Sequence, residues 1–251
     1  MKVMQLNVWA GRLTNRIVEL VKAEQPDVIC MQEVFGAGDT EIRVPNNFFD
    51  VLERVAHAGN YETTFFAPKY SIDYGGHLVE YGNAMVLNQP LLSQETYFVQ
   101  GSYTDKIDPA ASNVSRDDGP YNLQIAQINI DSTKLTIANH HGFWQPEPIG
   151  TAKTVECMQR VADKLHDVDG PLILCGDLNV SADSPAMRVF DGFLEDLTAT
   201  HNIKSTLSKL HYVENVACDH ILVSPEVNVK GYRAVDVLAS DHQALIIEFE
   251  V

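Results

Sequence analysis

Polar residues suited to acid–base or metal chemistry stand at the ends of apolar, strand-like runs in this sequence. They are Asn7, Glu33, His141, Asp177 with Asn179, and Asp241 with His242. One such residue alone is usually a turn cap or a surface side chain, but five runs that share this feature point to one cleft. Carboxylate and amide oxygens suit Mg²⁺ or Mn²⁺, and histidine exchanges protons near neutral pH. The pattern therefore predicts a site that combines a hard divalent cation with proton transfer.

The elements that must position these residues open with a β-α-β pattern. Residues 2–8 alternate apolar and polar and predict a strand, residues 12–24 predict an amphipathic helix that Pro26 ends, and residues 27–34 predict a buried strand. This opening is typical of layered α/β domains. Two packed sheets with helices outside would explain strands that are apolar on both faces.

The remaining pattern supplies more strands, two more helices and two long polar stretches. We expect helices at 47–58 and 151–167, and strands at 61–66, 82–88, 94–100, 121–130, 134–142, 170–180, 219–224 and 242–251. The stretches 67–82 and 101–120 are polar and predict surface loops. We find no repeat and no linker, so we expect a single domain over residues 1–251.

Charge and cysteine usage narrow the function further. The formal net charge of -16 gives an average field that repels DNA, RNA and anionic membranes, although bound divalent ions would offset it locally. The four cysteines show no CxxC spacing and predict reduced core thiols. The amino-terminal residues form a strand pattern without a basic leader, which predicts a cytoplasmic location.

Six short motifs give this sequence a family resemblance. LNVW, MQEV, NHHG, GDLN, CDHILVS and SDH follow one another in this order over almost the whole chain. In order and spacing they resemble the motifs of the endonuclease/exonuclease/phosphatase superfamily. The resemblance implies an α/β fold, a four-layer α/β/β/α sandwich of two packed, mostly antiparallel sheets flanked by helices. It also implies metal-dependent hydrolysis of a phosphoester bond.

The same resemblance assigns the metal ligands. Asn7 in LNVW and Glu33 in MQEV look like the primary ligands of Mg²⁺ or Mn²⁺, and Asp241 in SDH resembles the other carboxylate on the metal side. All three offer hard oxygen donors. A cation there would neutralise an oxygen of the phosphoester.

The resemblance also assigns the groups that act on water and phosphate. Asp177 in GDLN looks like the residue that activates the attacking water, and Asn179, on the same side of an extended segment, looks like a phosphate-orienting residue. His242 resembles the histidine that contacts the phosphoryl oxygens, and Asp219 resembles the carboxylate that steadies it. We expect these two to form a hydrogen-bonded pair, because an unpaired carboxylate is costly to bury. The Asn-x-His pattern of NHHG selects His141 rather than His140 for the phosphate or general-acid role.

Several other residues have a structural and a functional interpretation. Trp9 and Trp144 follow motif residues, and we favour packing over a role as pocket walls. Similarly, we interpret the segment with Lys69, Tyr70, His77 and Tyr81, and also Arg116, as solvated loop rather than a substrate grip. His220 is expected to pack beneath the site, and most of the remaining histidines, His57, His77, His166, His201 and His211, are expected at the surface.

Three further functions remain open as alternatives. A DNA repair nuclease of the same superfamily would display Lys and Arg interleaved with aromatic residues, and the two long polar stretches are mainly acidic. A membrane-lipid phosphodiesterase would need a basic amphipathic helix, which we do not find. An inactive binding or scaffold module would have lost metal ligands, and all of them are present. We therefore expect a monomeric hydrolase of a small phosphoester or a nucleic-acid end, with no membrane or extended duplex as partner.

Overall fold

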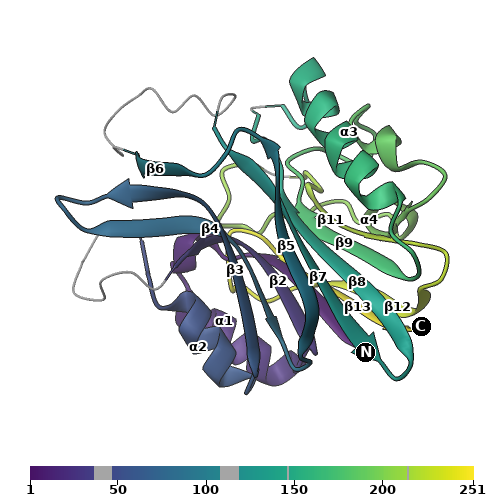
Figure 1. Cartoon of the computed structure of the whole chain (residues 1–251), viewed down its shortest axis with the longest axis horizontal. Helices are drawn as coiled ribbons and strands as arrows, with labels where there is room; N and C mark the ends of the chain where they lie inside the picture. The colour runs from purple at the N-terminus through teal and green to yellow at the C-terminus, as the bar shows by residue number, and fades with distance from the viewer. Residues whose placement is uncertain (37–46, 108–118, 146, 214) are drawn as a thin grey trace.

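Two β-sheets pack face to face in the computed structural model, which describes residues 1–36, 47–107, 119–145, 147–213 and 215–251 (Figure 1). The first sheet has the strand order β12-β13-β1-β2-β4-β3-β6, with β1 (Lys2–Asn7), β2 (Val28–Phe35), β3 (Thr63–Asp73), β4 (Leu78–Leu87), β6 (Thr104–Ile107), β12 (Asn228–Val235) and β13 (Ala244–Glu250). The second sheet has the order β10-β11-β9-β8-β7-β5, with β5 (Leu91–Gln100), β7 (Tyr121–Ile130), β8 (Thr133–His141), β9 (Leu172–Asp177), β10 (Glu195–Asp196) and β11 (Asp219–Val223).

Most neighbouring strands in both sheets run antiparallel. The described exceptions are the parallel pairs β1–β2, β3–β6 and β8–β9. This pairing confirms the predicted architecture of two mostly antiparallel sheets. The parallel pairs β1–β2 and β8–β9 matter for function, because parallel neighbours bring their carboxyl ends to the same edge of a sheet.

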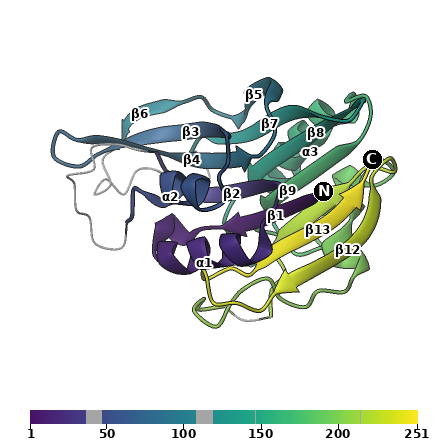
Figure 2. The same ribbon diagram turned by 90° about the horizontal axis from the view of Figure 1, so that it is seen from below.

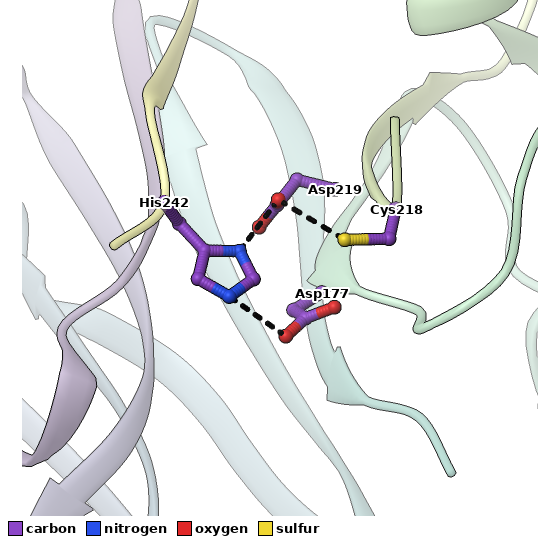
Figure 3. A group of neighbouring side chains, drawn as sticks. All are labelled: Asp177, Cys218, Asp219 and His242. Carbon is purple, nitrogen blue, oxygen red and sulfur yellow. Dashed lines mark hydrogen bonds and ion pairs between the residues drawn. The ribbon is translucent and has the colours of Figure 1, made fainter. Parts of the chain in front are cut away.

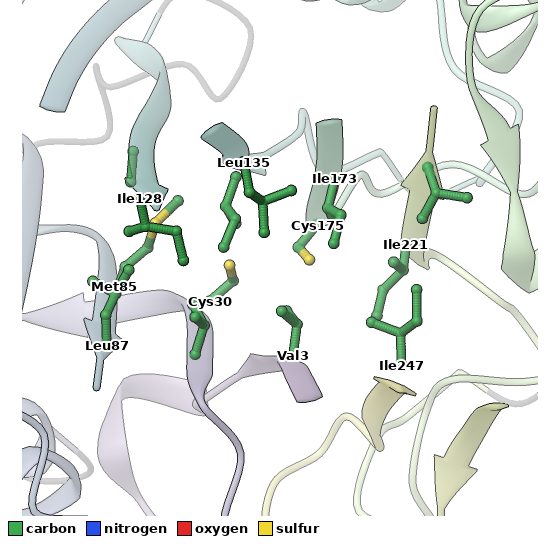
Figure 4. Packing of buried hydrophobic residues seen from close by; sticks show 14 of the residues in the cluster. Val3, Cys30, Met85, Leu87, Ile128, Leu135, Ile173, Cys175, Ile221 and Ile247 are labelled. Atoms are coloured by element: carbon green, nitrogen blue, oxygen red, sulfur yellow. The ribbon is translucent and has the colours of Figure 1, made fainter. Parts of the chain in front are cut away.

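Apolar side chains from both sheets meet in the middle of the sandwich. Figure 4 shows this cluster, in which Val3, Cys30 and Met85 of the first sheet face Ile128, Ile173 and others of the second. All of them are fully removed from water. Every second residue of these strands points into this core, and the residues between them pack under the helices outside, which explains why the strands are apolar on both faces.

Helices cover the outer faces of both sheets. The helices α1 (Thr14–Glu24) and α2 (Val51–Ala58) pack on the seven-stranded sheet, and α3 (Ala152–His166) packs on the other sheet (Figure 2). As expected, α1 ends before Pro26, where Gln25 takes a left-handed conformation. Thr151 caps α3 through a capping box with Thr154. The sandwich therefore has the four layers predicted from the sequence.

Three features of the fold correct the sequence prediction. Residues 67–82 are not a loop but the continuation of β3 and β4, which form a hairpin with its turn at 74–77. The buried face of this hairpin carries polar residues such as Lys69 and Ser71, which hid the alternation. The prediction also missed the partly exposed strand β12 and the short elements β6, β10 and α4 (Leu197–Thr200).

A network of amides joins the two sheets beneath the site. The side chain of Asn139 donates to the Met31 and Ala84 carbonyls and accepts from Gln32 Nε2 at 2.7 Å. Gln5 Nε2 donates to Asp219 Oδ1 at 2.6 Å. Because buried amides need specific partners, this network fixes how one sheet lies on the other. No helix in the described part of the chain is long and apolar enough to cross a membrane.

Candidate active site

The strand directions bring the motif residues to one edge of the sandwich. Asn7 is the last residue of β1, while His141 and Asp177 end the parallel strands β8 and β9. Asp219 begins β11, which runs antiparallel to β9. Similarly, the Asp241–His242 segment precedes β13, which runs antiparallel to β1. Starts of antiparallel strands lie beside the ends of their neighbours, so all these residues share one edge.

A cleft of about 640 Å³ opens at this edge. Six of the eight residues predicted for the site line it: Glu33, His141, Asp177, Asn179, Asp241 and His242. The other two, Asn7 and Asp219, lie directly behind it, because each is bonded to a residue of the lining. The structure therefore places all eight in or directly beneath one cleft.

Asp177 is held by hydrogen bonds to both of its carboxylate oxygens. Asn7 Nδ2 donates to Oδ2 at 2.9 Å, and the backbone amide of Asn179 donates to Oδ1 at 3.1 Å. His141 Nε2 and His242 Nε2 lie 3.6 and 3.8 Å from the same Oδ2. Burial raises the pKa of Asp177 to about 7, while the charge of His242 opposes the rise and that of Asp219 adds to it. A carboxylate with this pKa can accept a proton near neutral pH.

Asn7 has both side-chain atoms engaged with the protein. Its Oδ1 accepts from the Trp9 backbone amide at 3.0 Å, and its Nδ2 donates to Asp177. The side chain is almost completely buried, with 1% of its surface exposed. In this arrangement Asn7 orients Asp177.

His242 and Asp219 form the hydrogen-bonded pair that the sequence predicts. The distance from His242 Nδ1 to Asp219 Oδ2 is 2.8 Å, and both side chains are buried (Figure 3). Burial alone lowers the pKa of His242, but Asp219 and Asp177 outweigh this effect and raise it well above its ordinary value. His242 is therefore a cation beside the cleft. Gln5 donates a hydrogen bond to the other carboxylate oxygen of Asp219, so both oxygens of this carboxylate are held in place.

The two adjacent histidines of NHHG lie in different surroundings. His141 lines the cleft, whereas His140 is fully buried and bonds through Nδ1 to the Asn122 carbonyl at 2.9 Å. Burial, with the charge of Lys69, holds the pKa of His141 well below its ordinary value, so its imidazole is neutral. Its Nδ1 is buried and has no hydrogen-bond partner among the described residues.

Gly142, the last residue of NHHG, allows two strand ends to approach each other. A Cβ at this position would lie 2.2 Å from the Leu178 carbonyl oxygen, so any side chain would push apart the segments that follow His141 and Asp177. Its carbonyl accepts from Asn179 Nδ2 at 3.1 Å. The glycine thus sets the spacing between the two motifs.

Asn179 lines the cleft as predicted, but its backbone conformation differs from the predicted one. It does not lie on an extended segment, because β9 ends at Asp177 and Asn179 has a left-handed backbone with φ of 57°. Asparagine tolerates this conformation, and its backbone amide bonds to the Asp177 side chain in an Asx turn. The turn, rather than strand alternation, brings both side chains to the same cleft.

Glu33 lies in a β-bulge and not at the end of its strand. The strand β2 continues to Phe35, but its register with β4 shifts between Met31 and Val34. Glu33 itself has a φ of 59°. Bulges re-aim side chains and are frequent beside active sites, and this one turns Glu33 into the cleft.

The carboxylates of the cleft suit a divalent cation. Burial raises the pKa of Asp241 to about 6, against the charge of His242, and Glu33 and Asp219 raise it further. Glu33 also contributes to the raised pKa of Asp177. Such mutual repulsion among buried carboxylates is what a bound cation relieves, and their oxygens are hard donors. Asp177, Asp219, His242 and Cys218 form one group close enough to hold a metal ion, and Asp241, His242 and His211 form another.

The β3–β4 hairpin supplies one wall of the cleft, contrary to its interpretation as solvated loop. Lys69, Tyr70 and Tyr81 line the cleft, and Lys69 has 5% of its surface exposed. The Lys69 ammonium lies 5.3 Å from the centre of the Tyr81 ring and 5.2 Å from that of Tyr121. Burial lowers the pKa of Lys69 to about 8, while Glu33 and Asp177 oppose the shift.

Other secondary expectations had mixed outcomes. Trp9 and Trp144 line the cleft, so the pocket-wall interpretation is the correct one. His77 is exposed at the hairpin turn, and Arg116 lies outside the described residues. All four cysteines are buried thiols as predicted, although Cys218 also borders the cleft.

His211 is a titratable residue of the cleft that the sequence analysis assigned to the surface. It is half-buried, lines the cleft and lies edge-on to His242, with ring centres 5.8 Å apart. His220, by contrast, packs beneath the site as expected. It bonds to Asp196 and to the Val180 carbonyl at 2.9 and 2.8 Å.

Comparison with known proteins decides the family. The sequence matches the profile of the Endonuclease/Exonuclease/phosphatase family over residues 4–242. The chain belongs to this family. Proteins of the endonuclease/exonuclease/phosphatase family are hydrolytic phosphoesterases that typically depend on a divalent metal, which agrees with the cluster of acidic residues and histidines in the cleft. No curated protein sequence matches the chain.

Solved structures of the endonuclease/exonuclease/phosphatase family share this fold. An endonuclease/exonuclease/phosphatase from Beutenbergia cavernae is 18% identical with a TM-score of 0.74, and covers 100% of this chain and 71% of its own. A mannosyl-6-phosphatase from Bacteroides thetaiotaomicron is 16% identical with a TM-score of 0.71 and full coverage of both chains. The human Nocturnin catalytic domain is 20% identical with a TM-score of 0.65, and covers 100% of this chain and 94% of its own.

Proposed function

We propose that this chain is a Mg²⁺- or Mn²⁺-dependent hydrolase that cleaves a phosphoester bond by attack of a water activated by Asp177. The observation that carries the proposal is the convergence of a proton acceptor, two histidines and a set of carboxylates on one cleft. Attack on phosphorus needs a base for the water and positive groups for the phosphoryl oxygens. The cleft provides both.

Asp177 is the group that takes the proton of the attacking water. Its pKa of about 7 makes it a stronger base than an exposed carboxylate. At neutral pH part of it is still ionised and can accept the proton. Asn7 and the Asn179 amide fix the orientation of its two oxygens. Because the Asp177 carboxylate is already oriented, less entropy is lost when the water and its base are brought together for attack.

His242, His141 and Asn179 bind the phosphoryl group. The cationic His242 ring, with Nδ1 bonded to Asp219, offers Nε2 to a negatively charged oxygen. His141 is neutral and contributes a hydrogen bond rather than a charge. Asn179 Nδ2 already donates one hydrogen to Gly142 and has a second one available for the substrate.

Glu33 and Asp241, with Asn7 beside them, are the proposed ligands of the cation. Their carboxylates are hard oxygen donors, which favours Mg²⁺ or Mn²⁺ over Zn²⁺ as the native metal. When bound, the cation supplies charge neutralisation at the phosphoester oxygens. Asn7 Oδ1 accepts one hydrogen bond from the Trp9 amide and has a second lone pair that it could offer to the cation.

We expect the substrate to be a small phosphoester or the end of a nucleic acid, acted on by a cytoplasmic monomer. The net charge of -16 opposes an extended duplex, because its phosphates would be repelled at long range. Lys69, Tyr81 and Tyr121 add one cation and two phenol groups to the cleft lining that such a substrate would meet. The mannosyl-6-phosphatase among the structural neighbours is consistent with a small ligand.

A substrate screen tests this function directly. The purified chain is assayed with Mg²⁺ or Mn²⁺ on bis-p-nitrophenyl phosphate, then on sugar phosphates, nucleotides, lipid head groups and duplex DNA with an abasic site. We expect metal-dependent hydrolysis that a chelator abolishes, and activity on a small or terminal ester. Preferred cleavage of the abasic duplex would instead support the repair nuclease. Absence of hydrolysis on every substrate would favour a binding module.

A further inference from the structure

The segment that carries His211 is fastened to the Asp241–His242 motif. The backbone amide of Ser208 donates to the Asp241 carbonyl at 2.7 Å, and Leu207 pairs with His242 in an isolated β-bridge. The amide of Gln243 donates to the Thr206 carbonyl at 2.6 Å. These bonds hold residues 206–208 on the same side of the cleft as the motif. His211 is three residues further on, so the bonds between residues 206–208 and the Asp241–His242 motif also determine where His211 lies.

Contacts with Val213 orient the His211 ring. The backbone amide of Val213 donates to His211 Nδ1 at 3.0 Å, and the Val213 carbonyl oxygen lies 3.3 Å from the same atom. The amide contact is the shorter of the two and an amide can only donate, so we assign Nδ1 as the acceptor and place the ring hydrogen of the neutral imidazole on Nε2. The ring also stacks on Tyr212, with centres 4.5 Å apart and planes at 22°. In this tautomer Nε2 of His211 is a hydrogen-bond donor.

This donor is close to two of the proposed functional residues. One ring nitrogen of His211, one of His242 and a carboxylate oxygen of Asp241 lie within 4.8 Å of one another. Asp177 is not part of this group. In an in-line displacement the leaving oxygen departs on the side opposite the attacking water. His242 is close to both residues, since its Nε2 lies 3.8 Å from Asp177 Oδ2 and its ring belongs to the group with His211. For a phosphoryl group bound by His242, we therefore place the attacking water at Asp177 and the leaving oxygen at His211.

We propose that His211 is a further catalytic residue, whose Nε2–H donates a hydrogen bond to the leaving oxygen of the substrate. This inference rests on the proposed function. In the reaction the water oxygen bonds to phosphorus, Asp177 takes its proton, and the bond from phosphorus to the leaving oxygen breaks. The leaving oxygen keeps the electron pair of that bond. His211 stabilises this negative charge and transfers no proton, and the oxygen is then protonated by solvent.

Leaving groups of different acidity test the role. The chain is assayed with Mg²⁺ on two aryl esters that share one phosphoryl group, methyl p-nitrophenyl phosphate and methyl phenyl phosphate. p-Nitrophenolate is a stable anion and needs little help, whereas phenolate needs a donor. In His211→Asn the side chain can still accept from Val213 but cannot reach the substrate. We expect its kcat to fall at least about tenfold more for the phenyl ester than for the p-nitrophenyl ester.

Two further variants separate this role from a structural one. In His211→Gln the side-chain amide reaches the position of Nε2, so we expect it to restore part of the phenyl ester activity. His166→Asn makes the same kind of change at an exposed histidine of α3, and it should affect neither substrate. An equal loss on both esters, or no loss, would overturn the proposal. If the parent chain hydrolyses neither ester nor any other phosphoester, the proposed function itself fails.

Discussion

The Nδ1 atom of His242 lies 2.8 Å from the Oδ2 atom of Asp219, and no solvent reaches the carboxylate. The two residues are 23 positions apart: Asp219 begins β11 of the second sheet, and His242 lies just before β13 of the first. This hydrogen bond therefore connects the two sheets at the bottom of the cleft. It also keeps His242 protonated in a place where burial alone would make it neutral.

Replacement of Asp219 by Asn should shift the pH range of activity. Asp219 raises the pKa of His242, so its loss lowers that pKa, and the ring loses its proton at a lower pH. Because the cationic ring binds the phosphoryl oxygens, we expect the pH above which turnover declines to move downward. The measurement is the pH dependence of kcat for Asp219→Asn, His242→Gln and the double variant. Strictly additive losses with an unchanged upper limit would rule out the coupling.

Replacement of Asp177 by Asn should remove the proton acceptor without disturbing the fold. The amide has nearly the volume of the carboxylate, and its oxygen can still accept from one of the two donors, Asn7 Nδ2 or the Asn179 backbone amide. We expect turnover to fall at least about a hundredfold in a protein that remains folded, as checked by circular dichroism. The matched control is Asp169→Asn, an exposed aspartate before β9 that should have no effect. A fully active Asp177→Asn enzyme would show that another group activates the water.

Loss of Glu33 should weaken the metal site in a way that can be measured without substrate. Calorimetry of the parent chain should show binding of Mg²⁺ or Mn²⁺, and Glu33→Ala should bind at least about tenfold more weakly because it lacks one carboxylate ligand. Glu19→Ala, at an exposed position of α1, should bind like the parent. If the parent binds neither ion, or Glu33→Ala binds as tightly, the assignment of the metal ligands is wrong.

The site residues could be predicted because their types conflict with their surroundings. Polar groups at the ends of apolar strands, such as Asn7 and Asp177, are poor choices for a core and stand out in the sequence. Strand order and direction then bring them together, and the short motifs identify the order. The pair between Asp219 and His242 was predictable on the same grounds, because each lies beside a strongly apolar strand.

The missed features depend on backbone detail and on long-range contacts. The bulge at Glu33 and the left-handed turn at Asn179 are local deviations that alternation cannot reveal. Lys69 lies on the buried face of a hairpin, where a polar residue resembles a loop residue in the sequence. His211 reaches the cleft only because residues 206–208 pair with the segment before β13. No local pattern distinguishes it from a surface histidine.

His220 and Asp196 should make the stability of the protein depend on pH. Both partners of the fully buried His220 ring, the Asp196 carboxylate and the Val180 carbonyl, accept hydrogen bonds, so both ring nitrogens carry hydrogen and the ring is a cation. Burial alone would lower its pKa, but Asp196 raises the pKa above its ordinary value. The pair therefore stabilises the fold fully below about pH 6.5, and this stabilisation is lost as the pH rises through the pKa of the folded state.

The variant His220→Gln tests this dependence, because glutamine fills the site without a charge. We expect it to reduce the free energy of unfolding by about 2 kcal/mol at about pH 6, and by less as the pH rises through the raised pKa of His220. The measurement is urea unfolding of parent and variant across this range. The raised pKa of His242 affects both proteins equally and cancels in the difference. His166→Gln, at an exposed site, should show no difference at any pH, and a loss in His220→Gln that is independent of pH would mean that the buried ring is neutral.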